Sequence, residues 1–374
     1  MASRVQTACN RKSSNRSLRY SGCTESLRGR RSGGDKTCGS KGEKAPGIPR
    51  IHHLHGEKAV TTNLVSSKGS SRHLHAVVVA FNPDPDFSNR LARLTTQFEK
   101  VWIVNNGDPL NLPSVIPSSS QRHSALVIDM HGNAGIAAAI NAGVRAAAVA
   151  GAAWAALFDQ DSICPDGFAD VGFAAIEWAA DHAQVALFAP IFADSGNIYQ
   201  RPKNSDVERY PMVEEAITSG SFVRLSTFLA LGGYDESFFI DFVDHDYMLR
   251  LNQTGHEARS LPIELIHSIG KGERKSFFGK SFVTTHHSPG RLFASGHNMM
   301  KLIFRHSFRS PRMCLKLSTR EVLRILKIII YESDRVIKVK AWFSGFFRAF
   351  SRSSSVSAAD LSRWNINSRV FPSQ

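Results

Sequence analysis

The sequence of 374 residues lacks a long apolar run and uses cysteine sparingly. No stretch approaches the roughly 18 consecutive apolar residues that predict a membrane-spanning helix. The five cysteines include no C-x-x-C pair, which disfavours both a zinc module and a disulfide framework. They are Cys9, Cys23, Cys38, Cys164 and Cys314. A reducing, cytoplasmic compartment fits this cysteine usage.

Residues 1–72 have few acidic and almost no aromatic side chains. They carry fifteen basic against four acidic residues and are rich in Ser and Gly, so they cannot bury enough apolar surface to fold alone. We therefore predict a disordered basic leader over residues 1–72. The same composition is typical of a transit peptide, but no clear amphipathic helix supports that alternative.

The positive charge of the chain lies outside its middle. The total is +14, yet residues 291–374 carry sixteen basic against four acidic residues, which leaves a net −9 for residues 73–290. Nucleic-acid binding is disfavoured because the core is acidic and the basic residues sit in the flanks.

Strand and helix patterns alternate through the middle of the chain. Apolar runs predict strands at Leu74–Phe81, Val101–Val104, Leu126–Ile128, Trp154–Phe158, Leu187–Ile191 and Ile263–Ile266, with helices near Pro85–Glu99 and Gly135–Ala150. This alternation predicts an α/β fold with a Rossmann-like, mostly parallel sheet. In such a fold the chemistry gathers at the carboxyl ends of the strands.

The C-terminal part has a different pattern. From Thr319 to Phe350, apolar residues recur at helical spacing between basic ones. We predict a catalytic domain at 73–290, a basic amphipathic helical extension at 291–350 and a flexible tail at 351–374. The extension either lies on an anionic membrane surface, as a peripheral contact on the cytoplasmic face, or packs on the enzyme's own core.

Two carboxylates follow the predicted strand Trp154–Phe158. Asp159 and Asp161 lie two residues apart, so one turn could aim both at a ligand. Oxygen ligands of this kind suit Mg²⁺ or Mn²⁺. The alternative is a solvated turn or a helix cap.

Three further acids lie in the segment Phe238–Leu251. Asp241, Asp244 and Asp246 have apolar neighbours, and burial beside like charges would raise their pKa values into the range of a general base. An acidic helix start, stabilised by the helix dipole, explains Asp244 and Asp246 equally well.

Two other polar positions have a structural and a functional explanation each. His267 follows a predicted strand, where a lone histidine is more often a hydrogen-bonding residue than a metal ligand. The run Asn133-Ala134-Gly135 places a glycine where backbone can approach a ligand, or simply where a loop becomes a helix.

Taken together and in order, seven segments resemble the family 2 glycosyltransferases, and within them the rhamnosyltransferase group. The segments are Ala80-Phe81-Asn82, Val104-Asn105-Asn106-Gly107, Gly132–Gly143, Phe158-Asp159-Gln160-Asp161, Thr218-Ser219-Gly220-Ser221, Gly232–Arg250 and Ile266-His267-Ser268-Ile269-Gly270. The resemblance covers about residues 74–305, and residues 232–246 are its most diagnostic part.

The resemblance implies a glycosyltransferase A-type nucleotide-sugar-binding fold and an inverting reaction. Asp161 and His267 would hold Mg²⁺ or Mn²⁺, and Asp244 would be the catalytic base. Phe81, Asn82, Asn105, Asn133 and Asp159 would bind a nucleoside diphosphate sugar, with dTDP-rhamnose expected. Ser219, Gly220 and Asp241 would border a glycan or lipid-linked saccharide acceptor of cell-surface polysaccharide synthesis. The chain departs from its relatives at Asn105, where they often carry Asp, and at His297, where they often carry Arg.

Two other functions compete with this interpretation. An apolar strand followed by Asp-x-Asp also describes the nucleophile loop of haloacid-dehalogenase-type phosphatases, although that loop usually lies near the start of its domain. A non-catalytic sugar- or nucleic-acid-binding protein is the second alternative, and the intact Asp159, Asp161 and Asp244 weigh against it.

Overall fold

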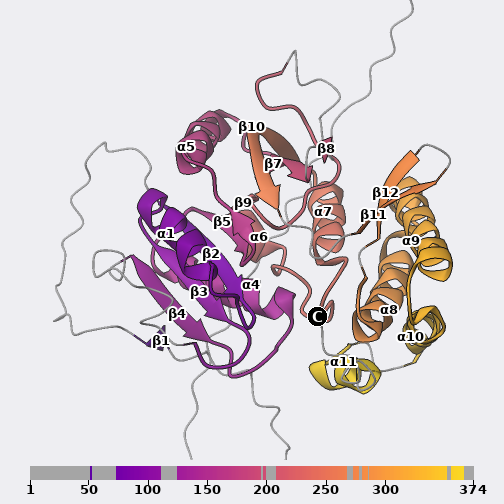
Figure 1. Ribbon diagram of the computed structural model, residues 1–374. Coiled ribbons are helices and arrows are strands. Elements are labelled where there is room, and N and C mark those ends of the chain that lie inside the picture. Colours follow the sequence, from indigo (N-terminus) through magenta and orange to yellow (C-terminus); the bar gives the residue numbers. More distant parts are fainter. Residues whose placement is uncertain are drawn as a thin grey trace, which may run out of the picture. The chain divides into compact units, whose positions relative to one another are not determined.

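The computed structural model describes residues 51–52, 73–110, 124–194, 197–198, 208–267, 273–277, 280–284, 286–351 and 355–365. Ten strands in these ranges form one sheet: β1 (Ile51–His52), β2 (Leu74–Ala80), β3 (Val101–Asn105), β4 (Ala125–Asp129), β5 (Trp154–Asp159), β6 (Ser162–Ile163), β7 (Val185–Asp194), β8 (Asn197–Ile198), β9 (Phe222–Arg224) and β10 (Glu257–His267). Their order is β1-β4-β3-β2-β5-β9-β7-β10-β6, with β8 paired to β7 (Figure 1). The strands β11 (Glu273–Phe277) and β12 (Lys280–Thr284) form a separate hairpin.

Helices cover both faces of the sheet. In the sheet region they are α1 (Phe87–Gln97), α4 (Ile136–Val149), α5 (Phe168–Trp178), α6 (Leu225–Ala230) and α7 (Val243–Gln253), with a 3-10 turn at Ala179–Asp181. Alternate residues of β2 enter two different cores, since side chains of a strand point to opposite faces. Val77 and Val79 pack with α4, α6 and α7, whereas Val78 packs with α1 and α5.

The predicted α/β fold with a mostly parallel sheet is confirmed. Neighbouring strands run parallel from β4 through β3 and β2 to β5, and again between β7 and β10. One difference lies between these two groups, where β9 pairs antiparallel with both β5 and β7. Strand β9 has only three residues, too few for a periodicity that a sequence pattern could reveal.

The strand predicted at Ile263–Ile266 is longer in the structure. Strand β10 begins at Glu257, because the polar residues Arg259 and Ser260 have partners within the fold. Arg259 forms ion pairs with Glu257 and Glu208, and Ser260 is buried. A strand can contain buried polar side chains when their hydrogen bonds are satisfied, and a search for apolar runs does not detect that part of it.

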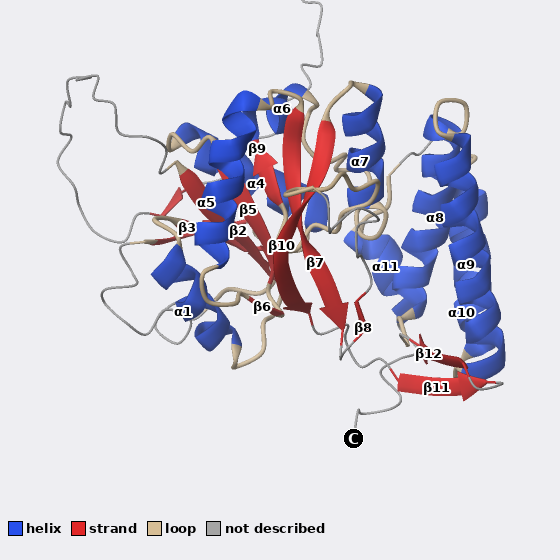
Figure 2. Ribbon diagram, turned by 90° about the horizontal axis from the view of Figure 1, so that it is seen from above, coloured by secondary structure: helices blue, strands red, loops and turns tan. Residues whose placement is uncertain are grey.

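In the described residues that follow the sheet, the helices are α8 (Pro289–His306), α9 (Pro311–Tyr331), α10 (Arg335–Arg348) and α11 (Ala358–Asn365). Figure 2 shows α8, α9 and α10 side by side. Among the described residues of the segment predicted as a flexible tail (351–374), Ala358–Asn365 form α11, whose Leu361 and Trp364 pack against a small core around Phe293. None of the described helices is both long and apolar enough to cross a membrane.

Other predictions fall largely outside the described residues. Within the predicted leader only Ile51–His52 is described, paired with β4. Of the five cysteines, Cys164 and Cys314 are described, and both are buried and not bonded to another cysteine. Burial raises the pKa of the Cys164 thiol to about 12, so this side chain is a packing residue.

Two glycines allow α8 and α10 to cross closely. A Cβ atom on Gly345 would collide with the carbonyl of Phe293, and one on Gly296 would collide with the carbonyl of Trp342. Both obstacles are backbone atoms, which cannot rotate away as a flexible side chain could.

We expect Gly345→Ala to destabilise the protein. Forcing the helices apart should cost about 2–3 kcal/mol, the upper part of the usual range because both obstacles are backbone atoms, which outweighs the roughly 1 kcal/mol that alanine gains over glycine in a helix. Urea unfolding would measure the change. Ser344→Ala, on the exposed face of the same helix, is the matched control and should shift stability by less than about 0.5 kcal/mol. A Gly345→Ala variant as stable as the control would contradict this account of the crossing.

Candidate functional site

The turn that carries Asp159 and Asp161 is anchored to the neighbouring strand and helix. Gln160 accepts a hydrogen bond from the Phe81 N–H through its side-chain oxygen, at 2.6 Å. The backbone carbonyl of Gln160 accepts another from Arg90 Nε, at 2.7 Å. Phe81 itself is 47% exposed at the end of β2. Both predicted carboxylates therefore lie at the carboxyl edge of the parallel strands.

Asparagine side chains stiffen the adjoining loops. Asn106 donates to the Asn133 side-chain oxygen at 3.3 Å and accepts from the Ala134 N–H at 2.9 Å, which links the end of β3 to the start of α4. Asn105 is buried and donates to the Asp108 carbonyl at 3.0 Å. Asn82 in turn accepts from the Asp108 N–H at 2.8 Å. Asn82 and Asn105 are thus linked through Asp108, and Asn133 is held separately by Asn106.

Glycine at the start of α4 serves packing. A Cβ atom on Gly135 would collide with the carbonyl of Phe239, which itself accepts a hydrogen bond from the Ile136 N–H at 2.9 Å. Gly135 also has a φ of 88°, where glycine is strongly favoured. Loop-to-helix geometry explains this glycine, and the contact with Phe239 ties α4 to the loop that precedes α7.

Ser219 and Gly220 lie beside the turn that carries Asp159. The Ser219 hydroxyl accepts from the Asp159 N–H at 3.2 Å and shares a hydrogen bond of 2.6 Å with the Ser162 hydroxyl. Gly220 has a φ of 75°, and its N–H donates to the Leu157 carbonyl at 2.7 Å. The predicted acceptor-side loop and the Asp159 turn are therefore held together.

Arg291 pairs with Asp241. This arginine, in the first turn of α8, donates to the carboxylate through Nη2 at 2.8 Å and Nε at 3.1 Å. Burial favours the neutral acid, but the Arg291 charge outweighs it and lowers the pKa of Asp241 to about 2. The pKa of Arg291 is raised chiefly by Asp241, with smaller contributions from Asp159 and Asp161.

Asp244 lies in the first turn of α7 and lines a cavity. Its carboxylate accepts from both the N–H and the ring Nδ1 of His245, each at 2.8 Å. Burial alone would lower the pKa of His245, but the carboxylates of Asp244 and Glu215 outweigh it and raise this pKa. The cavity has a volume of about 340 Å³ and lies between the start of α7 and α9. Its lining is Asp241, Phe242, Asp244, His245, Leu317, Arg320, Glu321 and Arg324.

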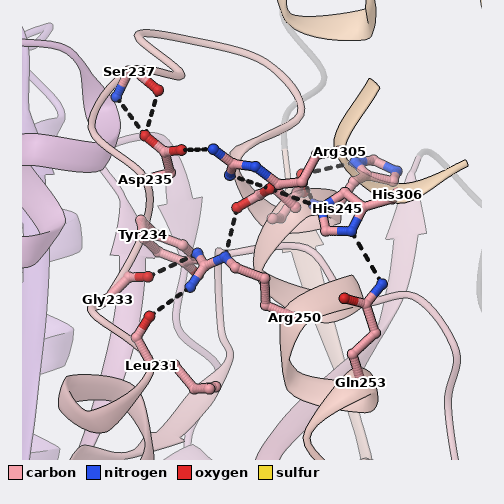
Figure 3. Close-up of polar contacts among 12 residues, drawn as sticks. Leu231, Gly233, Tyr234, Asp235, Ser237, His245, Arg250, Gln253, Arg305 and His306 are labelled. Atoms are coloured by element: carbon pink, nitrogen blue, oxygen red, sulfur yellow. Dashed lines mark hydrogen bonds and ion pairs between the residues drawn. The ribbon is translucent and has the colours of Figure 1, made fainter. Parts of the chain in front are cut away.

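Asp246 is fully buried and contacts three basic side chains. It accepts from Arg305 at 2.7 Å, Arg250 at 2.8 Å and His306 at 2.9 Å. Burial would raise the pKa of Asp246, but His306 and the two arginines lower it. Figure 3 shows the surroundings, where Arg250 also donates to the carbonyls of Leu231 and Gly233.

The prediction that burial beside like charges raises these pKa values is wrong for Asp241 and Asp246. Basic partners from α7 and α8 keep both carboxylates ionised. The alternative of an acidic helix start is confirmed for Asp244 and Asp246, which lie in the first turn of α7. Arg250 lies four residues from Asp246, but the other partners were missed because they lie 50 to 60 residues away along the chain.

The predicted metal ligands can be placed only in part. The side chain of His267 lies outside the described residues, but its backbone pairs with Ser162, the residue after Asp161, in the contact between β6 and β10. In the described part of the chain, no group of three or more His, Cys, Asp or Glu residues could hold a metal ion. One carboxylate and one further ligand still fit Mg²⁺, because this ion is commonly completed by substrate phosphates and water.

Sequence comparison shows a similarity over part of this site. Residues 76–227 match the model of glycosyl transferase family 2. This stretch begins in β2 and ends in α6, so it includes the Asp159 turn, the asparagine network and Ser219. Over this stretch the chain is similar to the family 2 glycosyltransferases. Asp241 and Asp244 lie beyond the end of the matched stretch.

The chain is also similar to individual proteins. It is 29% identical over 266 residues to the dTDP-rhamnosyl transferase RfbF of Shigella flexneri, covering 67% of this chain and 85% of that protein. The structure of S. aureus TarS overlaps with 12% identity and a TM-score of 0.44, over 78% of this chain and 47% of TarS. TarS residues 1–349 in complex with UDP-GlcNAc overlap with 13% identity and a TM-score of 0.43, over 78% of each chain.

Proposed function

We propose that this glycosyltransferase transfers L-rhamnose from dTDP-rhamnose, with inversion, to a glycan or lipid-linked saccharide in cell-surface polysaccharide synthesis. The observation that carries the reaction is the position of Asp244, whose carboxylate lines a cavity of about 340 Å³ beside the Asp241 loop. The similarity to a dTDP-rhamnosyl transferase supports the choice of donor.

The donor is proposed to bind at the carboxyl edge of the sheet. The residues proposed to bind it come from strand ends and the loops that follow them, and they are Phe81, Asn82, Asn105, Asn133 and Asp159. The hydrogen bonds among the asparagines support this proposal, because a network formed before binding lowers the cost of ordering the loops.

In the proposed reaction Asp244 takes the proton of the acceptor hydroxyl. The acceptor oxygen then bonds to the anomeric carbon as the bond to the diphosphate breaks on the opposite face, and the diphosphate leaves with the electron pair. Asp161 and His267 would hold Mg²⁺ or Mn²⁺, which supplies positive charge to the leaving diphosphate.

The acceptor is proposed to lie against Ser219, Gly220 and Asp241. Because Arg291 keeps Asp241 ionised, this carboxylate can accept hydrogen bonds from sugar hydroxyls without taking their protons. Asp241 therefore orients the acceptor, and Asp244 is left as the base.

We further propose that catalysis resides in residues 73–290, in the cytoplasm, with the helices of residues 291–350 at the cytoplasmic face of a membrane. The family match favours a glycosyltransferase over the phosphatase alternative. A binding protein without turnover is the second candidate, which the following experiment separates.

We expect release of dTDP from dTDP-rhamnose, dependent on Mg²⁺ or Mn²⁺, when the purified protein meets a panel of nucleoside diphosphate sugars with lipid-linked glycan acceptors. Asp161→Ala should lower this activity at least about 10²-fold. The reason is that the metal ion which Asp161 would hold stabilises the charge of the transition state by several kcal/mol. Asp166→Ala, an exposed carboxylate in the next loop, is the control and should keep full activity. Saturable dTDP-rhamnose binding without turnover would favour the binding-protein candidate.

A further inference from the structure

Exposed apolar side chains are concentrated on the C-terminal helices. Among the described residues, seventeen large hydrophobic side chains are exposed, and twelve of these lie between Phe304 and Phe350. Scattered exposed apolar residues need no explanation, but a contiguous group indicates a contact surface.

On α9 these side chains form a stripe. Leu315, Val322, Leu326 and Ile330 recur at spacings of seven, four and four residues, so they lie along one side of the helix. The opposite side of α9 is buried and includes Leu317, Ile325 and Ile328. The four side chains of the stripe therefore do not pack in the core of the protein.

Helix α10 has a similar exposed side. Val336, Lys340, Phe343 and Phe347 follow at helical spacing, and all four are exposed. Beyond the end of α10, the ring of Phe350 contacts Phe304 of α8 at 5.1 Å between centroids. Aromatic and aliphatic side chains thus extend over the outer sides of three helices.

The charge around these stripes is positive. The exposed basic residues of α9, α10 and the turn before them are Arg309, Arg312, Lys316, Arg320, Arg335 and Lys340. Lys316 and Arg320 pair with Glu215, and Arg320 lines the cavity. The basic residues left for this outer face are therefore Arg309, Arg312, Arg335 and Lys340. The acids are mostly turned inward, since Glu332 is buried against Lys338 and Glu321 against Arg324. Of the acids in residues 301–350, only Asp334 is exposed.

We infer that this outer face of α9 and α10 docks onto an anionic lipid bilayer. Apolar side chains would enter the boundary between headgroups and acyl chains, and the flanking basic residues would meet the lipid phosphates. Because the exposed charge on this face is positive, an anionic bilayer is a better partner than a second copy of the chain. In a dimer, the basic residues of one copy would repel those of the other. The inference specifies the membrane contact of the proposed function, but it does not require turnover.

Sedimentation of the full chain with vesicles tests this inference without any donor sugar. The protein should bind phosphatidylglycerol-containing vesicles, less at higher salt, and should not bind pure phosphatidylcholine. The double variant Leu326→Ser/Phe347→Ser should bind at least about tenfold more weakly, because it removes two large apolar side chains. Since both residues are exposed, its unfolding midpoint should match that of the parent.

Val149→Ser is the matched control, because Val149 is 88% exposed at the end of α4, outside this face. It should bind vesicles like the parent. Vesicle binding that the double variant retains would overturn the inference. So would a lack of parental binding, or a concentration-dependent dimer that the double variant abolishes. Glycosyl transfer to a soluble acceptor, measured in parallel, reports separately on the proposed reaction.

Discussion

Replacing Asp244 with asparagine is expected to lower kcat about 10²- to 10⁴-fold, the range that a positioned general base contributes. Asparagine keeps the shape of the side chain and an oxygen for the hydrogen bond from the His245 N–H, but it cannot take a proton. The affinity for dTDP-rhamnose, measured by calorimetry, should change little, because Asp244 lines a cavity that none of the proposed donor-binding residues lines.

The matched control for this prediction is Asp170→Asn. Asp170 also lies in the first turn of a helix, α5, but it is exposed and does not line the cavity. Its kcat should equal that of the parent. If Asp244→Asn kept more than about a tenth of the parental kcat, another residue would have to be the base.

Asp246→Asn is expected to lower the free energy of unfolding by about 3–5 kcal/mol, the usual effect of breaking a buried ion pair from one side. The substitution leaves Arg250, Arg305 and His306 around a neutral side chain with no exposed surface. It also weakens the link between α7 and α8, because these three partners come from both helices. Urea unfolding at neutral pH would measure the loss.

The pH dependence gives a second readout for Asp246. Its pKa is lower in the folded state than in the unfolded chain, so its stabilisation is present above the unfolded value of about 3.9 and is lost as the pH falls toward the folded value. The difference in the free energy of unfolding between the parent and Asp246→Asn should therefore become smaller as the pH falls. Asp166→Asn, where the side chain is 97% exposed, should show almost no gap at any pH. An equal effect of the two substitutions would rule out this role for Asp246.

Much of the sheet could be predicted because short stretches of sequence indicate where its strands begin and end. The strands from β2 to β5 are short apolar runs that end at polar residues, and each was located to within about two residues. Helix α5 was missed, since Phe168–Trp178 mixes apolar, glycine and acidic residues without a marked stripe. The antiparallel insertion of β9 depends on pairing with strands far along the chain, which no local pattern records.

The candidate site shows the same limit. Asp159 and Asp161 could be found because they follow a strand directly, and Asp244 because it lies in a diagnostic segment. Arg291 could not be connected with Asp241, because the pair depends on how α8 packs against the loop before α7. Asn106 was also missed as the link between two loops, although its position at the end of a strand was a usable signal.

Helix α9 has two sides with different surroundings. One side forms a wall of the cavity that Asp244 lines, through Leu317, Arg320, Glu321 and Arg324. The other bears the exposed stripe from Leu315 to Ile330. An acceptor embedded in a bilayer under that stripe would reach Asp244 by lateral diffusion within the leaflet. Turnover would then follow the surface density of the acceptor, its mole fraction among the lipids, rather than its amount per volume of solution.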